Sequence, residues 1–158
     1  MVPFDVATIH GGRYALIIWD VASTYGKCHI LSNKSNTSTR LREVILQWQR
    51  LSAKPIKTLW TNNSGKFNSV EFKKWLSNEG IHHEQSLPFF HQQNRIAERY
   101  NHTVTDMGRT ILLGSGLPKS FWGNAFMWDS YTNNILQNTH TGDLTPVEIL
   151  FGSKQRLD

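Results

Sequence analysis

Hydrophobic and polar positions alternate between strand and helix patterns along the first part of the chain. Residues 13–20 (RYALIIWD) form a nearly continuous apolar run, which predicts a strand covered on both faces. Residues 26–31 (GKCHIL) follow after a short connection that suits a hairpin. Residues 56–60 (IKTLW) and 81–86 (IHHEQS) predict two further strands.

Helical periodicity begins at about residue 37. The apolar side chains there recur at i, i+3, i+4, i+7 and i+10, which describes one face of a helix: Leu41, Val44, Ile45, Trp48 and Leu51. Pro55 is expected to end this helix, and a second helix is expected over residues 69–78, with Gly80 as its stop. Strand, helix, strand, helix and strand in this order predict an α/β domain with a mixed sheet.

The second half of the chain is predicted to be mostly helical. Residues 87–94 (LPFFHQQN) are expected to form a loop, and a long helix follows with its apolar stripe from residue 96 to 111. Further helices are expected from about 118 to 136 and over TPVEILFG, where Thr145 is the N-cap, Pro146 the first helical residue and Gly152 the stop.

Composition narrows the class of protein. A chain of 158 residues that is 39% hydrophobic can bury one domain-sized core. Its apolar runs are far shorter than a membrane span, and no secretory signal is expected. The single cysteine, Cys28, excludes an internal disulfide framework and a multi-cysteine zinc site, and it indicates a reducing, intracellular compartment. The net charge of +5 modestly favours a polyanionic partner, although a solvated basic surface explains the same charge.

Acidic residues near predicted element ends raise the possibility of metal-dependent chemistry. Phosphoryl transfer on nucleic acid commonly uses two divalent metal ions held by a few carboxylates. The candidates are Asp5, Asp20 and Glu98, and Asn62 stands where a fourth carboxylate could be. A lone glutamate near a helix start is more often only a favourable partner of the helix dipole, so these residues alone do not establish a site.

A longer set of motifs decides between these interpretations. The segment TNNSGKFNSVEFKKWLSNEGIHHEQSLPFFHQQNRIAERYNHTV, together with LPKSFWGNAF and TPVEILFG, resembles the integrase catalytic core of copia-type LTR retrotransposons, within the retroviral integrase superfamily. The resemblance extends over essentially the whole chain. It implies one RNase H-like α/β domain over residues 1–158, with a mixed sheet flanked by helices, an incomplete first strand and C-terminal helices at about 118–152.

Carried over residue by residue, the resemblance gives Glu98 the third position of the integrase acidic triad and Asn62 the second. The 35 residues between them match the family's spacing. Family members use Mg²⁺ or Mn²⁺, but the amide of Asn62 is neutral and offers one oxygen, so metal binding by this chain is expected to be weak. Glu98 and Asp5 remain the candidate metal ligands.

Two alternatives stay open for the first triad position. The segment MVPF resembles the end of a family motif whose aspartate would then lie upstream of Met1. Asp5 is the alternative, because its distance from the following strand suits a hairpin. Asp20 matches a D-x-x-S motif at the end of a strand and is interpreted as structural.

Other residues around the triad are candidates for contact with nucleic acid. Amide and guanidinium groups are suitable donors to a phosphate backbone, although loop polarity and helix capping explain the same residues: Asn63, Gln93, Asn94, Arg95 and Arg99. Adjacent His82 and His83 would point to opposite faces of a strand, which argues against a shared metal site. Trp122, Phe126 and Trp128 are interpreted as core or dimer-contact residues rather than a base-stacking platform.

The sequence therefore predicts an integrase catalytic domain that performs DNA integration by polynucleotidyl transfer and binds nucleic acid, in a form that is catalytically impaired by Asn62. The alternative is a non-catalytic nucleic-acid-binding or oligomerisation module derived from an integrase, and a third possibility is a fragment that folds poorly. DNA is the expected partner, with RNA as an alternative. A homodimer, the nucleus as location, and no membrane or small-molecule partner complete the expectations.

Overall fold

The computed structural model describes residues 2–62, 65–86 and 91–152, with the backbone alone at residues 2, 3, 86 and 91–98. The chain divides into two compact units. Unit 1 comprises Met1–Lys34 and Tyr100–Asp158, and unit 2 comprises Ser35–Arg99. Helix α3 (His91–Ser115) contributes its first turns to unit 2 and the remainder to unit 1.

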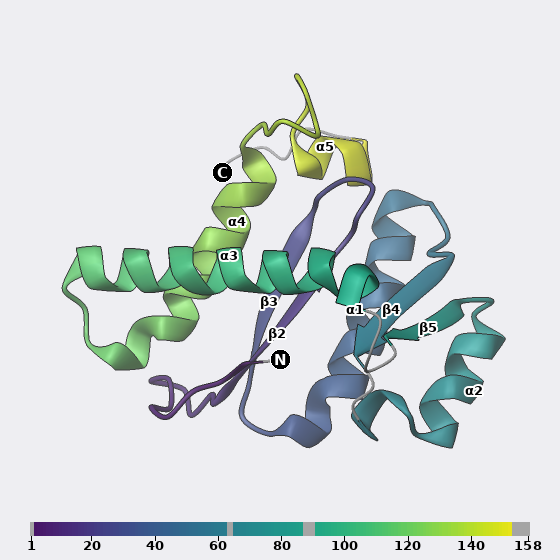
Figure 1. Ribbon diagram of the computed structural model, residues 1–158, viewed down its shortest axis with the longest axis horizontal. Coiled ribbons are helices and arrows are strands. Elements are labelled where there is room, and N and C mark those ends of the chain that lie inside the picture. Colours follow the sequence, from purple (N-terminus) through teal and green to yellow (C-terminus); the bar gives the residue numbers. More distant parts are fainter. Residues whose placement is uncertain (1, 63–64, 87–90, 153–158) are drawn as a thin grey trace. The chain divides into compact units, whose positions relative to one another are not determined.

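Unit 1 contains a three-stranded antiparallel sheet of β1 (Val2–Pro3), β2 (Tyr14–Trp19) and β3 (Gly26–Leu31), in the order β1-β2-β3 (Figure 1). The predicted hairpin is confirmed, because β2 and β3 pair over their whole length from Tyr14↔Leu31 to Trp19↔Gly26. β1 pairs over two residues only.

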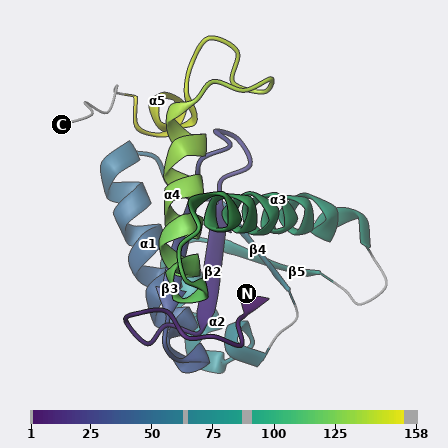
Figure 2. The same cartoon turned by 90° about the vertical axis from the view of Figure 1, so that its left-hand side faces the viewer.

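Helix α4 (Trp122–Ile135) packs along β3 in unit 1, as both cartoon views show (Figures 1 and 2). It follows a short 3₁₀ turn, Lys119–Phe121. The side chain of Asn134 fixes this packing: its Oδ1 accepts from the Gly26 backbone N–H at 2.8 Å, and its Nδ2 donates to the Gly26 carbonyl at 2.6 Å. These bonds satisfy the backbone of a buried strand end.

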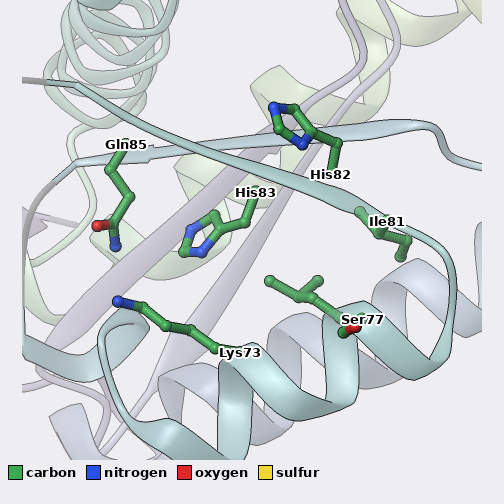
Figure 3. A pocket seen from close by; sticks show the side chains of 7 residues that line it. Lys73, Ser77, Ile81, His82, His83 and Gln85 are labelled. Carbon is green, nitrogen blue, oxygen red and sulfur yellow. The ribbon is translucent and has the colours of Figure 1, made fainter.

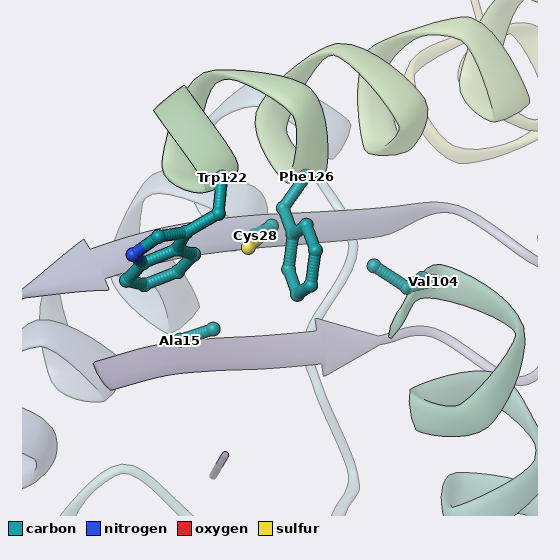
Figure 4. Packing of buried hydrophobic residues seen from close by; sticks show 5 residues of the cluster. All are labelled: Ala15, Cys28, Val104, Trp122 and Phe126. Carbon is teal, nitrogen blue, oxygen red and sulfur yellow. The ribbon is translucent and has the colours of Figure 1, made fainter. Parts of the chain in front are cut away.

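The hydrophobic core of unit 1 lies between the hairpin, α3 and α4. Figure 4 shows its central members, which are all nearly inaccessible to solvent: Ala15, Cys28, Val104, Trp122 and Phe126. Burial raises the pKa of the Cys28 thiol to about 12, so this cysteine is a packing residue and not a nucleophile. The core role predicted for Trp122 and Phe126 is confirmed, whereas Trp128 is 61% exposed.

The last helix, α5 (Pro146–Phe151), has the predicted ends. Thr145 forms a capping box with Glu148, in which each side chain bonds to the backbone N–H of the other residue. Pro146 begins the helix, and Gly152 ends it in the left-handed conformation at φ +73°.

Unit 2 begins with α1 (Thr37–Ser52), whose predicted apolar stripe is buried at Leu41, Val44, Ile45 and Trp48. β4 (Thr58–Asn62), a 3₁₀ turn (Gly65–Phe67), α2 (Val70–Asn78) and β5 (His82–Ser86) follow. Strands β4 and β5 pair in parallel, from Thr58↔His82 to Asn62↔Ser86, and α2 packs against β5.

Several boundaries differ from the sequence prediction, among them the start of β4, which lies at Thr58 and not at residue 56. Residues 91–94 were assigned to a loop, but they form the first turn of α3, which begins at His91. Residues 87–90 of the predicted loop lie outside the described residues. No helix in the described part of the chain is both long and apolar enough to cross a membrane.

Candidate functional site

Asn62 is the last residue of β4, and its side chain is exposed. It pairs in register with Ser86, the last residue of the neighbouring parallel strand. The carboxyl ends of parallel strands meet at one edge of a sheet, where α/β proteins commonly place their functional groups. The predicted second triad position therefore lies at a suitable edge, although an amide stands there.

Strand alternation divides the side chains of β4 and β5 between two faces of the sheet. The odd-numbered residues face α2: the hydroxyl of Thr61 lies 2.9 Å from His83 Nε2, and Gln85 donates to Asn68 Oδ1 at 2.5 Å. Figure 3 shows His83 and Gln85 pointing from β5 toward α2 and His82 pointing away. The prediction that His82 and His83 serve opposite faces is confirmed.

An open hollow of about 360 Å³ lies between β5 and α2 (Figure 3). It is lined by polar and basic residues and by two aliphatic ones: Lys73, Leu76, Ser77, Ile81, His82, His83 and Gln85. Burial lowers the pKa of His83, and the positive charges of Lys73 and His82 lower it further, so the neutral imidazole is favoured.

The opposite face of the sheet carries Trp60, Asn62 and Glu84. Trp60 donates its indole N–H to Glu84 Oε2 at 2.6 Å across the β4–β5 pair. His82 Nε2 lies 3.7 Å from the other carboxylate oxygen of Glu84. Trp60 and Glu84 are not recognisable as a pair from the sequence, because the link depends on the register of two strands separated by α2.

The remaining triad candidates are placed on different parts of the chain. Asp5 is exposed in a bend after β1 and belongs to unit 1, whereas Asn62 and Glu98 belong to unit 2. Glu98 lies on α3, but its side chain is outside the described residues. Asp20 has the structural role predicted for it, since its Oδ2 accepts from the backbone N–H of Ser23 at 2.8 Å and from the Ser23 hydroxyl at 2.5 Å.

The residues predicted to contact nucleic acid are neighbours of Asn62 and Glu98 in the sequence. Gln93, Asn94 and Arg95 lie in the first turns of α3, and their side chains are outside the described residues. Asn63 is also outside the described residues. Arg99, one residue after Glu98 on the same helix, is exposed.

A divalent metal ion needs several oxygen ligands that converge on one point. The described residues contain no group of three or more histidines, cysteines, aspartates or glutamates that could hold one. Asn62 contributes an amide and Asp5 is an exposed residue of the other unit. The side chains that the structure describes therefore do not form a metal site by themselves.

The net charge of the chain is confined to one unit. Unit 2 contains ten lysines and arginines against five aspartates and glutamates, which gives a formal charge of +5. Unit 1 contains seven of each, so its formal charge is zero. The unit that carries Asn62, Glu98 and the β4–β5 sheet is therefore the basic one.

Comparison with known sequences identifies retrotransposon and retroviral polyproteins as relatives. The chain is 32% identical over 132 residues to the retrovirus-related Pol polyprotein from transposon TNT 1-94 of Nicotiana tabacum, which covers 84% of this chain and 10% of that protein. It is 30% identical over 148 residues to the corresponding polyprotein from transposon RE2 of Arabidopsis thaliana, covering 93% of this chain and 10% of that protein. The chain spans about a tenth of the length of these curated relatives. No protein-family profile matches the sequence.

Comparison with solved structures identifies the fold. The HTLV-2 integrase catalytic core domain in complex with magnesium, in its trimeric form, matches with a TM-score of 0.62 and 23% identity over 86% of this chain and 83% of that chain. A chain of the simian T-cell lymphotropic virus intasome in complex with PP2A regulatory subunit B56 gamma matches with a TM-score of 0.65 and 19% identity, over 90% of this chain and 49% of that chain. The predicted resemblance and the RNase H-like α/β class are confirmed.

Proposed function

The chain is a relative of retrotransposon Pol polyproteins and has the fold of integrase catalytic cores, and from this premise we propose that it is an integrase-core-like domain that binds DNA. Its ancestral reaction is DNA integration by polynucleotidyl transfer. In this chain the binding function is retained and the chemistry is impaired.

The observation that carries the proposal is the distribution of charge. All of the formal charge of +5 belongs to unit 2, which also contains the candidate positions Asn62 and Glu98. A protein that neutralises phosphates gains affinity by releasing counterions, and this gain does not depend on catalysis. A basic unit that carries an altered triad position is therefore suited to holding DNA without cutting or joining it.

The impairment follows from the chemistry of the second triad position. A carboxylate there would contribute charge and up to two oxygens to a metal ion, whereas the Asn62 amide contributes one neutral oxygen. Magnesium is bound in the HTLV-2 core domain, and Glu98 and Asp5 are the residues of this chain that we propose as its remaining ligands. Because Asn62 supplies a neutral amide in place of a carboxylate, Mg²⁺ or Mn²⁺ is expected to bind weakly.

A strand-transfer assay tests the impairment. The purified chain is incubated with a labelled donor duplex that ends in a recessed 3′ hydroxyl and a plasmid target, in Mg²⁺ or Mn²⁺. We expect no joined product above the level of a Glu98→Gln variant, which serves as the matched control. Efficient joining by the unmodified chain, abolished in Glu98→Gln, would overturn the impairment while leaving the DNA-binding proposal intact.

A salt titration tests the binding. The logarithm of the affinity for a DNA duplex should fall linearly with the logarithm of the salt concentration, because phosphate contacts release counterions. RNA of the same length is measured in parallel, since a phosphate-based interaction accepts either polymer. Absence of salt-dependent binding at low ionic strength would refute the proposal.

The alternative is an oligomerisation module derived from an integrase. The HTLV-2 core domain is described in dimeric and trimeric forms, and a homodimer is the assembly that we propose for this chain. Light scattering of the purified chain at several concentrations distinguishes the two functions, because a pure oligomerisation module would form dimers without binding DNA. As a DNA-binding domain, the chain is proposed to act in the nucleus.

A further inference from the structure

Trp60 is an exposed aromatic residue with a fixed orientation. Its side chain is 52% exposed, although its only polar atom is already satisfied by Glu84 at 2.6 Å. Tryptophan side chains are highly buried on average, whereas this one is half exposed. A hydrogen bond that holds the ring leaves its π face available to a ligand at a reduced cost in conformational entropy.

The position of this ring relative to the candidate site follows from strand geometry. Trp60 and Asn62 are two residues apart on β4, so their side chains leave the same face of the sheet. That face is opposite to the one that packs on α2, where His83 and Gln85 point (Figure 3). Trp60 therefore lies beside the predicted second triad position, on the side that α2 leaves uncovered.

Glu84 keeps the indole in place from the neighbouring strand. It pairs in register with Trp60, and its second carboxylate oxygen lies 3.7 Å from His82 Nε2. Because the indole N–H is used in this bond, it cannot serve as a donor to a ligand. The ring can then contribute stacking but no sequence-specific hydrogen bond.

We propose that Trp60 is a stacking platform for an unpaired nucleobase, a role that rests on the proposed binding of DNA. The formal charge of +5 on unit 2 attracts the phosphates of the same strand. Bases within a duplex are already stacked on both sides, so the occupant is a base from a single strand or a frayed end. Base-on-aromatic stacking tolerates any sequence, which agrees with a ring that offers no free donor.

The test separates stacking from charge by comparing two oligonucleotides. The affinities of the purified chain for dT12 and for an abasic strand with the same number of phosphates are measured by fluorescence anisotropy in EDTA. Their ratio is the base factor, which reports contacts to bases alone. The variants are Trp60→Ala, Trp60→Phe and Glu84→Gln, and Trp128→Ala is the matched control, because Trp128 is 61% exposed on the uncharged unit.

We expect Trp60→Ala to reduce the base factor by about 5- to 150-fold, the range for loss of one stacked base. Trp60→Phe should retain part of it, and Glu84→Gln should retain most of it, because the glutamine oxygen still accepts from the indole. The salt dependence should be the same in Trp60→Ala and the unmodified chain, since no phosphate contact is lost. Thermal melting and light scattering confirm that each variant keeps its fold and assembly.

Three results would overturn the inference. If the unmodified chain binds both strands equally, or if Trp60→Ala has the same base factor as Trp128→Ala, Trp60 is not a platform, although DNA binding stands. If the unmodified chain binds neither strand at low salt, both this inference and the proposed binding function are wrong.

Discussion

Asp129 offers a sharp test of how the core of unit 1 is built. This residue on α4 is only 3% exposed. Its Oδ1 accepts from Asn133 Nδ2 at 3.0 Å, whereas Oδ2 is buried with no hydrogen-bond partner among the described residues. Burial raises the pKa of the carboxyl to about 6, and the bond from Asn133 opposes this rise only in part. The ionised form is therefore disfavoured in the folded state.

The effect on stability follows from the difference in pKa between the folded and unfolded chain. The ordinary value is 3.8, so the pKa rises by about 2 units on folding, which is worth up to about 3 kcal/mol at about 1.4 kcal/mol per unit. Between pH 4 and 6 the folded state binds more protons than the unfolded state. The contribution of Asp129 to the free energy of unfolding then falls as the pH rises through this window and levels off above it.

The assay compares urea unfolding of the unmodified chain and Asp129→Asn at intervals from pH 4 to pH 8. Asn is neutral at every pH, so the stability of Asp129→Asn relative to the unmodified chain should increase by up to about 3 kcal/mol between pH 4 and pH 7. The neighbouring Cys28 and Tyr100 do not interfere, because burial raises both of their pKa values far above this range. Asp143→Asn, at an exposed position, is the control for loss of one carboxylate from the chain. A flat or declining difference for Asp129→Asn would refute the reasoning.

Three further changes test other parts of the structure. Gly26→Ala should destabilise the chain by about 1–3 kcal/mol in urea unfolding, because the added methyl group would overlap the phenol of Tyr100, and unchanged stability would show that the ring can move. Thr145→Ala should cost about 1 kcal/mol by removal of the capping box, whereas Thr145→Ser should restore most of it. Asn62→Asp alone should not restore strand transfer if Asp5 is not the first carboxylate, and recovery of strand transfer would identify Asp5 as a functional triad member. In EDTA the same variant should bind DNA several-fold more weakly, because it places a negative charge on the basic unit.

The local features of the fold were largely predictable because they depend on neighbouring residues. The stripe from Leu41 to Trp48, the hairpin of β2 and β3, and the helix start at Thr145 each follow from spacing or from residues close together in the sequence. The loop assignment for residues 91–94 was wrong for a related reason. Polar composition suggested a loop, but glutamine is a good helix former and HQQN contains no glycine or proline to stop a helix.

Features that depend on distant residues were not predictable. The bond between Trp60 and Glu84 requires the parallel register of β4 and β5, which the intervening helix sets. Asp129 is buried because α4 packs on β3. The sequence around it does not reveal this, because the apolar Trp128 before it is exposed and the polar Ser130 after it is buried. The candidate positions Asn62 and Glu98 came from resemblance to a family and not from periodicity.

Catalysis and DNA binding require different side chains on the same surface. Catalysis by two metal ions needs converging carboxylates, and their negative charges would repel a phosphate backbone unless the metal is bound. Binding without chemistry needs the opposite: positive charge, neutral donors and an aromatic surface. Asn62 and Trp60, on one face of the basic unit, fit the second set. Under the proposed function, an amide in place of a carboxylate impairs the reaction and also removes a requirement for metal, so DNA binding by this chain should be independent of Mg²⁺ and unaffected by EDTA.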